Sequence, residues 1–331
     1  MKNKISIALC TFNGAKFLSA QLESFLKQTR LPDELIVCDD CSTDETVKIL
    51  QEFSAVSPFS VKIFVNEKNL RSTKNFEKAI LLCVGNLIFL SDQDDVWKPE
   101  KIEKIEAEFN KNPKLGMIFS DAEIVDENLK PLEKNLFDFT FPETARNGNI
   151  FDILLSQNAV TGATMAFRAE FCKSFMPFPD NIPNLIHDAW IALSISANAE
   201  TKFIAEPLIK YRQHTAQQLG INFESMQKKT FAERKKFYAE SIEFLRKEIA
   251  RLTKLSEVFR DFPQFARKIE SVDFVRLIEE KESQIKHLEA RMKLPANKIG
   301  RLLPITREVL SGRYQRFSKG ILSAGKDFLE K

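Results

Sequence analysis

The sequence predicts an α/β protein, with a mostly parallel sheet flanked by helices and a helical C-terminal region after it. Short apolar runs alternate with segments of helical period up to about residue 120, and this alternation is typical of a parallel sheet with helices on both faces. Polar clusters follow three of the apolar runs directly. From about residue 223, glycine is absent until Gly300 and charged sequence of helical period predominates.

Five apolar runs of four or five residues are expected to form the first strands, and they are 5–9, 35–38, 61–65, 87–90 and 115–119. Short continuous apolar runs of this kind are typical of buried strands. Residues 121–220 contain scattered Pro, Asn and Gly, so we expect a long irregular excursion around the functional site. Two further strands are expected within this excursion, near 164–167 and at 208–210.

Helices are expected between these first strands. The first has apolar residues at helical spacing from Leu18 to Leu26. The second is predicted to begin at a capping box in residues 42–45, with sequence Ser-Thr-Asp-Glu, which is a common start of a helix. A third helix is expected at 76–83, and a fourth is expected to begin near Pro99, because proline suits the first turn of a helix.

Two domains are predicted, 1–220 and 221–331. In the second domain, apolar residues recur at near-heptad spacing from Ile242 to Phe259, and another helix is expected to follow Pro263. This pattern predicts a helical hairpin packed on the first domain or on another copy of the chain. Residues 295–331 then form a basic amphipathic tail with eight Lys or Arg against three acids.

Composition excludes some classes of protein. The net charge is +3, which argues against a dedicated nucleic-acid binder. The five cysteines are odd in number and mostly lie in apolar runs, so they are expected to be reduced thiols of a cytoplasmic protein. We find no signal-peptide pattern and no run near the ~20 apolar residues of a membrane-spanning helix.

An acidic run follows the fourth predicted strand. Asp92, Asp94 and Asp95 lie within four residues of one another, and their charges repel unless a cation offsets them. A hard, oxygen-ligated ion such as Mg²⁺ or Mn²⁺ fits such a cluster and usually leaves positions open for substrate phosphates. The alternative is a solvated acidic turn ahead of Pro99, because acidic turns are common.

Two polar clusters follow other strands at the same predicted edge. Asp39 and Asp40 follow the second strand, where an acid can accept hydrogen bonds from a ribose hydroxyl or a base N–H. Their alternative role is to begin the turn into the next helix. Thr11, Phe12 and Asn13 follow the first strand. Ligands of parallel sheets bind beyond the carboxyl ends of the strands, so these clusters are expected to share one pocket with the acidic run.

Two further motifs are candidates for a catalytic role. Asp188, beside His187 at the start of an apolar segment, is either a general base for an acceptor hydroxyl or a helix N-cap. Arg212 and His214 follow the last predicted strand. They either bind a diphosphate leaving group or belong to an exposed loop.

Three segments together resemble the signatures of family 2 glycosyltransferases, which are inverting enzymes of the GT-A fold. They are residues 5–13 (ISIALCTFN), 35–44 (LIVCDDCSTD) and 90–97 (LSDQDDVW). The last of these, with 161–168 (TGATMAFR) and 211–214 (YRQH), is most similar to the bacterial rhamnosyltransferase-like branch. The resemblance covers roughly residues 4–215.

The resemblance implies roles for single residues. Thr11, Phe12 and Asn13 would border the nucleoside of the donor. Asp40 would bond its base, with Asp39 nearby. The sequence departs from the family pattern at Cys41, where glycine is usual, and at His187, where an acid is common.

The metal and the catalytic base are implied in the same way. Asp92 and Asp94 match the DxD motif of the family, with Asp94 as the direct ligand of Mg²⁺ or Mn²⁺. Asp188 matches the catalytic base, and Arg212 or His214 would neutralise the leaving diphosphate.

The function implied is a hexosyltransferase-type glycosyltransferase (EC 2.4) that moves a sugar, with rhamnose a candidate, from a UDP- or dTDP-linked donor. Its acceptor would be a hydroxyl of a glycan or a lipid-linked molecule in cell-surface polysaccharide synthesis. The expected location is the cytoplasm, or the cytoplasmic face of the inner membrane through contacts of residues 295–331, and the C-terminal helices are candidates for homo-oligomer formation. The alternatives are a metal-dependent nucleotidyltransferase and a catalytically silent nucleotide-binding scaffold.

Overall fold

The computed structural model describes residues 3–141, 148–180, 182–215, 231–261, 270, 272–295 and 297–329. The chain divides into two compact units. Unit 1 contains Met1–Pro179 and Leu185–Ile221, and unit 2 contains Asp180–Asn184 and Asn222–Lys331. The domain boundary predicted at residue 220 and the helix break predicted at Pro263 lie outside the described residues.

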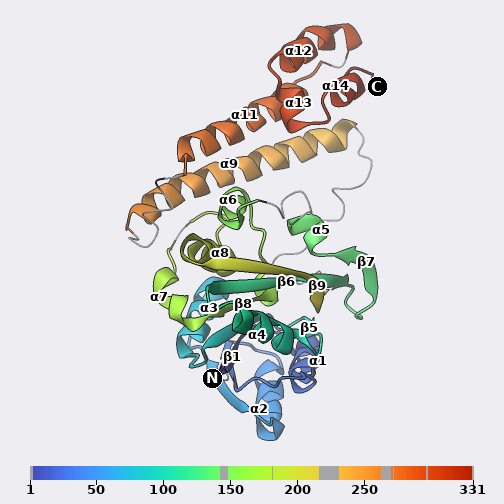
Figure 1. The fold of residues 1–331 in the computed structure, drawn as a ribbon. Coiled ribbons are helices and arrows are strands. Elements are labelled where there is room, and N and C mark those ends of the chain that lie inside the picture. Colours follow the sequence, from blue (N-terminus) through green and yellow to red (C-terminus); the bar gives the residue numbers. More distant parts are fainter. Residues whose placement is uncertain are drawn as a thin grey trace. The chain divides into compact units, whose positions relative to one another are not determined.

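Unit 1 is built on a sheet with the strand order β3-β2-β1-β4-β8-β6-β9-β5, in which β7 pairs with β6 (Figure 1). The α/β prediction is therefore confirmed. The strands are β1 (Ile5–Thr11), β2 (Glu34–Asp39), β3 (Ser60–Val65), β4 (Leu87–Ser91), β5 (Val96–Trp97), β6 (Leu115–Val125), β7 (Pro131–Asn135), β8 (Met165–Arg168) and β9 (Glu200–Arg212).

The sheet has a parallel part and a mixed part. Strands β3, β2, β1 and β4 are all parallel, as the strand–helix alternation predicts. β8 then lies antiparallel between β4 and β6. β9 pairs in parallel with β6 along most of its length, so it is much longer than the short strand predicted at 208–210. The expectation of an irregular 121–220 is wrong, because this region supplies three sheet strands and several helices.

Helices connect these strands, in part at positions that differ from the predictions. They are α1 (Ala15–Leu26), α2 (Thr46–Val56), α3 (Arg71–Leu82), α4 (Lys101–Lys111), α5 (Phe137–Thr140), α6 (Ile150–Ser156), α7 (Cys172–Phe175) and α8 (His187–Asn198), with 3₁₀ turns η2 (Gly162–Thr164) and η3 (Ala169–Phe171). The predicted capping box is wrong. α2 begins at Thr46 with no side-chain cap at Glu45, because Asp44 binds the Thr46 N–H and Ser42 binds Asp39 instead.

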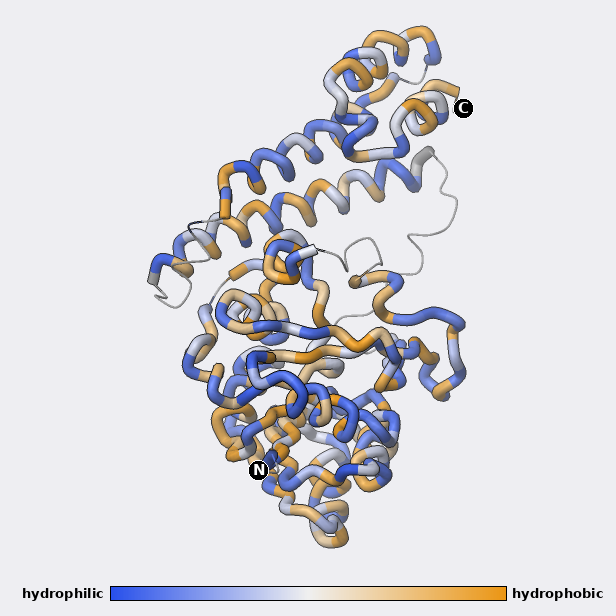
Figure 2. The backbone as a smooth tube through the Cα atoms, in the orientation of Figure 1, coloured by the Kyte–Doolittle hydropathy of each residue, from blue (hydrophilic) through white to orange (hydrophobic). Residues whose placement is uncertain are grey.

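The core of unit 1 lies between the sheet and its helices. Leu22 and Phe25 of α1 pack in one cluster with strand residues such as Leu9 and Phe89. The strands β1, β2 and β4 are buried along their whole length, and Figure 2 shows how apolar and hydrophilic stretches alternate along the backbone of this unit. Burying both faces of these strands fixes their carboxyl ends in place, and those ends carry the polar clusters.

Unit 2 is helical and has an apolar cluster of its own. It contains α9 (Phe231–Asp261), α11 (Phe274–Met292), α12 (Lys298–Leu310), α13 (Arg313–Phe317) and α14 (Ile321–Leu329). α9 and α11 pack along each other. Leu294, Ile305, Tyr314 and Ala324 form the apolar cluster beneath the last three helices.

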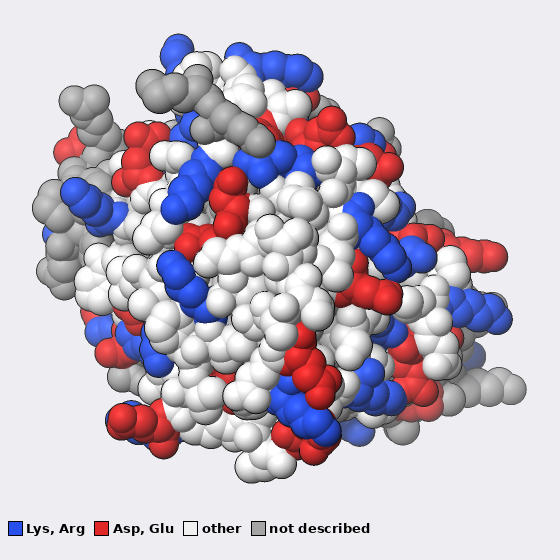
Figure 3. Space-filling model, turned by 90° about the horizontal axis from the view of Figure 1, so that it is seen from below, with Lys and Arg blue, Asp and Glu red and all other residues white. Residues whose placement is uncertain are grey.

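The surface carries both signs of charge on the face seen from below the view of Figure 1. There, acidic and basic side chains are interspersed around uncharged areas (Figure 3). Among the described residues, no helix is both long enough and apolar enough to cross a membrane.

Candidate functional site

Three strand ends lie side by side at one edge of the sheet. β1 pairs in parallel with both β2 and β4, so Thr11 lies opposite Asp39 and Leu9 opposite Ser91. The chain continues from these positions into Phe12, Asp40 and Asp92. The three polar clusters predicted from the sequence are thus neighbours along one edge, as the ligand-binding rule for parallel sheets requires.

Gln93, in the middle of the acidic run, binds the segment after β1. The side-chain amide of Gln93 accepts a hydrogen bond from the backbone N–H of Phe12 at 2.9 Å and donates one to the carbonyl of Phe12 at 3.0 Å. Gly14 makes room for this contact, because a Cβ at that position would lie 2.1 Å from Gln93 Oε1. The acidic run and the segment 11–14 are therefore held as one surface.

Asp39 is fully buried and is bonded within the protein. Thr11 Oγ1 donates to Asp39 Oδ2 at 2.8 Å, and the backbone N–H of Ser42 donates to Oδ1 at 2.9 Å. The Ser42 hydroxyl in turn accepts a hydrogen bond from the backbone N–H of Asn13 at 2.8 Å. Asp39 thus joins the ends of β1 and β2, and this contact orients Thr11 and Asn13.

Asp40 directly follows the end of β2 and is buried. Its carboxylate accepts hydrogen bonds from the backbone N–H groups of Leu70 and Arg71 and from the side chain of Asn66, at 2.7 to 2.9 Å. These contacts hold the segment that leads into α3. A carboxylate has about four acceptor positions, so a hydrogen bond to a nucleobase would use the capacity that remains. That role for Asp40 stays a prediction.

Two residues at this edge have left-handed backbone conformations. Asn13 has φ 46° and Cys41 has φ 67°. Asparagine tolerates this region well, whereas other side chains are strained there. Glycine, which is usual at this place in the family pattern, would adopt this conformation without strain.

The acidic run has an electrostatic environment that disfavours three ionised carboxylates. Burial, and the negative charges of Asp94 and Asp188, raise the pKa of Asp92 to about 7. Burial and the charges of Asp94 and Asp92 also raise the pKa of Asp95. Asp95 Oδ1 accepts the backbone N–H of Arg212 at 3.1 Å, whereas Oδ2 has no hydrogen-bond partner among the described residues. A cation next to this run would relieve the repulsion.

Lys101 lies behind the acidic run and is fully buried. Its ammonium donates to the carbonyl oxygen of Ala163 at 2.5 Å and lies 3.8 Å from the centre of the Trp97 ring. Burial lowers the pKa of Lys101 to about 7, although the charges of Asp95 and Asp92 act in the opposite direction. Sequence reasoning missed this residue, because a lysine at the start of an amphipathic helix is ordinarily exposed.

His214 and Arg212 both reach Asp94, but by different contacts. His214 Nε2 lies 2.8 Å from Asp94 Oδ2. The guanidinium of Arg212 donates to the carbonyl oxygen of Asp94 at 2.6 Å and lies 4.6 Å from the centre of the Phe17 ring. Arg212 thus supports the backbone of the acidic run, and His214 contacts its carboxylate. Binding of a leaving diphosphate by either residue stays a prediction.

Asp188 lies in the first turn of α8 rather than at its N-cap, which is Ile186. Its carboxylate accepts hydrogen bonds from the backbone N–H groups of Gly162 at 3.0 Å and Ala189 at 2.6 Å, and from Asn158 at 3.1 Å. Burial raises the pKa of Asp188 to about 6, although these hydrogen bonds lower it. Since its charge also raises the pKa of Asp92, Asp188 lies close to the acidic run.

His187 is buried next to Asp188 and is neutral. Its ring stacks on Phe76 with a centroid separation of 4.0 Å, and burial lowers its pKa to about 3. A Cβ on Gly162 would lie 3.0 Å from His187 Nε2. The histidine at this departure from the family pattern therefore packs between α3 and η2 and adds no charge beside Asp188.

The acidic run fits a divalent cation in its chemistry, although not as a complete cage. Asp92 and Asp94 supply hard carboxylate oxygens, and His214 adds a nitrogen beside Asp94. Among the described residues, no three His, Cys, Asp or Glu side chains are grouped closely enough to hold an ion by themselves. An ion here would share its remaining positions with a phosphate-bearing ligand and water, as Mg²⁺ commonly does.

The fold and this edge define a class of protein. The sheet, with an acidic run beyond β4, is the arrangement that the resemblance to GT-A glycosyltransferases implies. Residues 6–173 match the model of the family "Glycosyl transferase family 2". The chain belongs to this family and is a glycosyltransferase.

Similar proteins agree with this assignment. The chain is 27% identical over 250 residues to the dTDP-rhamnosyl transferase RfbG of Shigella flexneri, an alignment that covers 71% of this chain and 82% of that protein. The fold is shared with residues 1–349 of TarS from S. aureus in complex with UDP-GlcNAc (TM-score 0.52, 16% identity, 98% of this chain and 91% of that chain). It is also shared with the mannosyltransferase PcManGT from Pyrobaculum calidifontis in complex with GDP-Man and Mn²⁺ (TM-score 0.51, 14% identity, 99% and 88%).

Proposed function

We propose that this glycosyltransferase moves a sugar from a nucleoside-diphosphate donor to an acceptor hydroxyl by direct displacement, with inversion at the anomeric carbon. L-Rhamnose on dTDP is the first donor to test, because the relative from S. flexneri is named for this transfer. The acceptor we propose is a glycan or a lipid-linked sugar in cell-surface polysaccharide synthesis. The observation that carries the proposal is the buried Asp188, whose charge acts on Asp92 of the acidic run beyond β4.

Asp188 is the proposed catalytic base. Its pKa of about 6 keeps it largely ionised at neutral pH and still basic enough to accept a proton from an acceptor hydroxyl. The contacts from Gly162, Ala189 and Asn158 orient the carboxylate. Because His187 is neutral, it does not lower the basicity of Asp188.

Asp94, with Asp92 and His214, is the proposed metal-binding group. When bound, Mg²⁺ or Mn²⁺ would supply positive charge that stabilises the diphosphate as it leaves. Gln93 fixes the backbone of the acidic run against Phe12, and Arg212 fixes the carbonyl of Asp94. These contacts hold the run in its shape before the donor binds, which is the condition for electrostatic catalysis.

The nucleoside of the donor is proposed to lie over Thr11, Phe12 and Asn13. Phe12 is about half exposed (49%), so its ring is open to contact with a base or sugar. Asp39 holds Thr11 from behind, and Asp40 is proposed to bind the base with its remaining acceptor capacity.

The test is a panel of UDP- and dTDP-sugars with Mg²⁺ or Mn²⁺, assayed for release of nucleoside diphosphate. Asp94→Ala should reduce turnover on the order of a hundredfold or more, because the charge on the leaving group loses its counter-ion. The exposed Asp152→Ala is the control and should leave the rate unchanged. Near-normal turnover of Asp94→Ala would refute the metal assignment, and release of pyrophosphate in place of a diphosphate would favour a nucleotidyltransferase.

Asp188→Asn separates binding from transfer. We expect donor binding to persist and the rate of transfer to fall by about 10²- to 10⁴-fold, the range typical for loss of a general base. Asp121→Asn is the matched control, because Asp121 is also buried and accepts two backbone N–H groups but lies outside the proposed site. Equal losses in both variants would show a structural effect and remove the base assignment.

A further inference from the structure

Helix α12 of unit 2 exposes most of its apolar side chains and buries two of its charged ones. Its buried residues are Arg301, Ile305 and Glu308. The opposite face carries Ile299 (84% exposed) and Leu310 (82% exposed), with Leu302 and Leu303 between them. This is the reverse of an ordinary surface helix, in which the apolar stripe faces the core.

Helix α14 also exposes large apolar side chains and buries an acid. It buries Ala324 and Asp327. Ile321 and Leu322 are 79% and 78% exposed. Two helices of this unit thus expose large apolar side chains. An exposed apolar patch of this kind commonly marks an interaction site.

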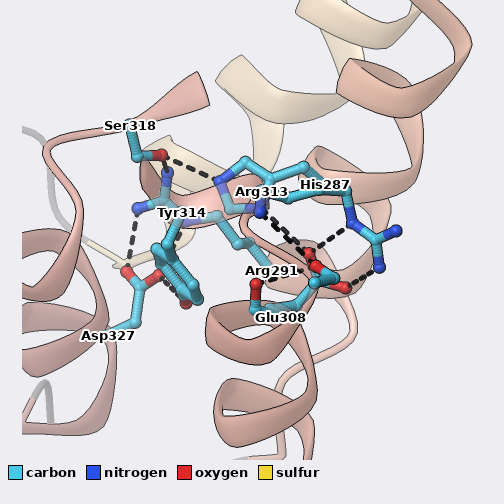
Figure 4. Close-up of polar contacts among 8 residues, drawn as sticks. His287, Arg291, Glu308, Arg313, Tyr314, Ser318 and Asp327 are labelled. Atoms are coloured by element: carbon cyan, nitrogen blue, oxygen red, sulfur yellow. Dashed lines mark hydrogen bonds and ion pairs between the residues drawn. The ribbon is translucent and has the colours of Figure 1, made fainter. Parts of the chain in front are cut away.

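Buried ion pairs hold the helices in this orientation (Figure 4). Arg291 donates two hydrogen bonds to Asp327, at 2.6 and 3.0 Å, and the Tyr314 hydroxyl donates a third at 2.7 Å. His287 lies between Glu308 and Ser318, at 3.0 and 2.8 Å. Glu308 of α12 and Asp327 of α14 are therefore paired inside the unit. Turning either helix to bury its leucines would separate these buried pairs, which is costly.

The charges that remain on the surface of this region have one sign. Glu308 and Asp327 are the acids among residues 297–329, and both are buried. The exposed charged residues there are Lys298, Arg307, Arg316, Lys319 and Lys326. This contrasts with the mixed charges on the face in Figure 3. An anionic partner is therefore favoured over a neutral or cationic one.

A pocket of about 480 Å³ lies beside the exposed end of α14. Its polar lining consists of Arg234, Arg291, Lys319, Lys326, Ser318 and Ser323, and Leu322 also borders it. Arg291 and Ser318 are already bonded to Asp327 and His287, so the exposed Lys319 and Lys326, with the Ser323 hydroxyl, are the groups that match the acceptor oxygens of a phosphate group. The exposed Leu322 would lie next to whatever chain such a phosphate carries.

We propose that unit 2 binds the surface of a bilayer that contains anionic phospholipid. Six exposed apolar residues contact the acyl region, and we call them the docking surface: Ile299, Leu302, Leu303, Leu310, Ile321 and Leu322. The pocket binds a lipid phosphate. Exposed leucines with surrounding lysine and arginine are the composition of an interfacial helix. The proposed contact is with the surface of the bilayer. This inference does not depend on the proposed transfer chemistry.

The test is flotation of the full chain with vesicles of phosphatidylglycerol and phosphatidylcholine in equal parts, and with phosphatidylcholine alone. We expect binding to the first and at least about tenfold weaker binding to the second, because each cation near an anionic surface contributes about fivefold to affinity. Equal binding to both vesicles would overturn the role of the pocket.

Two double variants test the apolar residues and the cations of this surface separately. Ile321→Ser with Leu322→Ser removes apolar contact, and Lys319→Gln with Lys326→Gln removes two cations of the pocket. Each should weaken binding to the anionic vesicles by about tenfold or more. The matched controls are Leu81→Ser with Val84→Ser, which are exposed on unit 1, and Lys236→Gln with Lys247→Gln, which are exposed on α9.

Controls should float as the unchanged protein does, and nucleotide release in solution should be the same for all variants. Loss of flotation in the controls as well would mean that charge or hydropathy in general, and not this surface, causes binding. If the unchanged protein fails to float and instead forms oligomers that Ile321→Ser with Leu322→Ser dissociates, the surface binds a second copy and the membrane proposal is wrong.

Discussion

Asp188 has to be ionised to accept a proton, and the protein raises its pKa to about 6 through burial. The groups that face it are Asp92, which is acidic, and His187, which is neutral. The turnover rate should therefore fall about tenfold per pH unit below about pH 6 and level off above it, because only the carboxylate acts as a base. Turnover at saturating donor, measured across this range, checks the prediction. A flat profile would show that another group takes the proton.

The backbone conformation of Cys41 leads to a second prediction at the residue scale. Its φ of 67° strains a side chain, and glycine relieves the strain. Cys41→Gly should stabilise unit 1 by up to about 1 kcal/mol, partly offset by loss of the contact from its thiol to the carbonyl of Asn66. Thermal unfolding measures the change.

The control for this substitution is Cys172→Gly. Cys172 has φ −53° in a helical conformation, so glycine there should destabilise the protein by about 1 kcal/mol. A loss of stability in both variants would show that the turn at Cys41 is not strained.

The junction of β1 and α1 is the element that connects the donor segment to the acidic run. Gly14→Ala would force Gln93 away from the backbone of Phe12, because the added Cβ would lie 2.1 Å from Gln93 Oε1. We expect the KM for the donor to rise by about tenfold or more, as a loosened site loses positioning. Gly325→Ala is the control, since nothing lies within 4 Å of a Cβ there, and an unchanged KM in Gly14→Ala would exclude the Gln93 contact from donor binding.

The neighbouring elements give the three aspartates of the acidic run different surroundings. Asp94 contacts His214, Asp95 binds the backbone of Arg212 on β9, and Asp92 is partly exposed at the strand end. The antiparallel pairing of β5 with β9 brings these residues together. A turn of the same sequence on an isolated strand would lack both contacts, to His214 and to the backbone of Arg212.

At the scale of the whole molecule, the two units have separate apolar clusters. A ligand that binds unit 1 should therefore raise the melting transition of unit 1 and leave that of unit 2 unchanged. A nucleoside diphosphate with Mn²⁺ at about a hundred times its Kd should add about 2.7 kcal/mol to unit 1. Calorimetry with and without chelator measures this shift, and an equal shift of all transitions would show that the units unfold together.

Much of the fold followed from the sequence, because apolar period and turn residues act locally. The strands at 5–9, 35–38, 61–65 and 87–90 were predicted within a few residues of β1 to β4. The capping box at 42–45 was wrong for a tertiary reason, since Asp39, from the end of β2, competes for Ser42. The order of β8, β6 and β9 in the sheet could not be predicted, because their pairing is antiparallel in part and joins residues far apart in the chain.

The acidic run, the acids after β2 and the residues after β1 could be found from sequence alone, because parallel strands bring their carboxyl ends to one edge. Only the tertiary structure decided how those residues are used. In the folded chain, Gln93 binds the backbone of Phe12, and Lys101 is buried behind the acids. Gly162 and Asn158 donate hydrogen bonds to the Asp188 carboxylate. The leucines of α12 and α14 face outward. Hydropathy predicts that a segment is amphipathic, but which face is buried depends on the ion pairs that the surrounding helices provide.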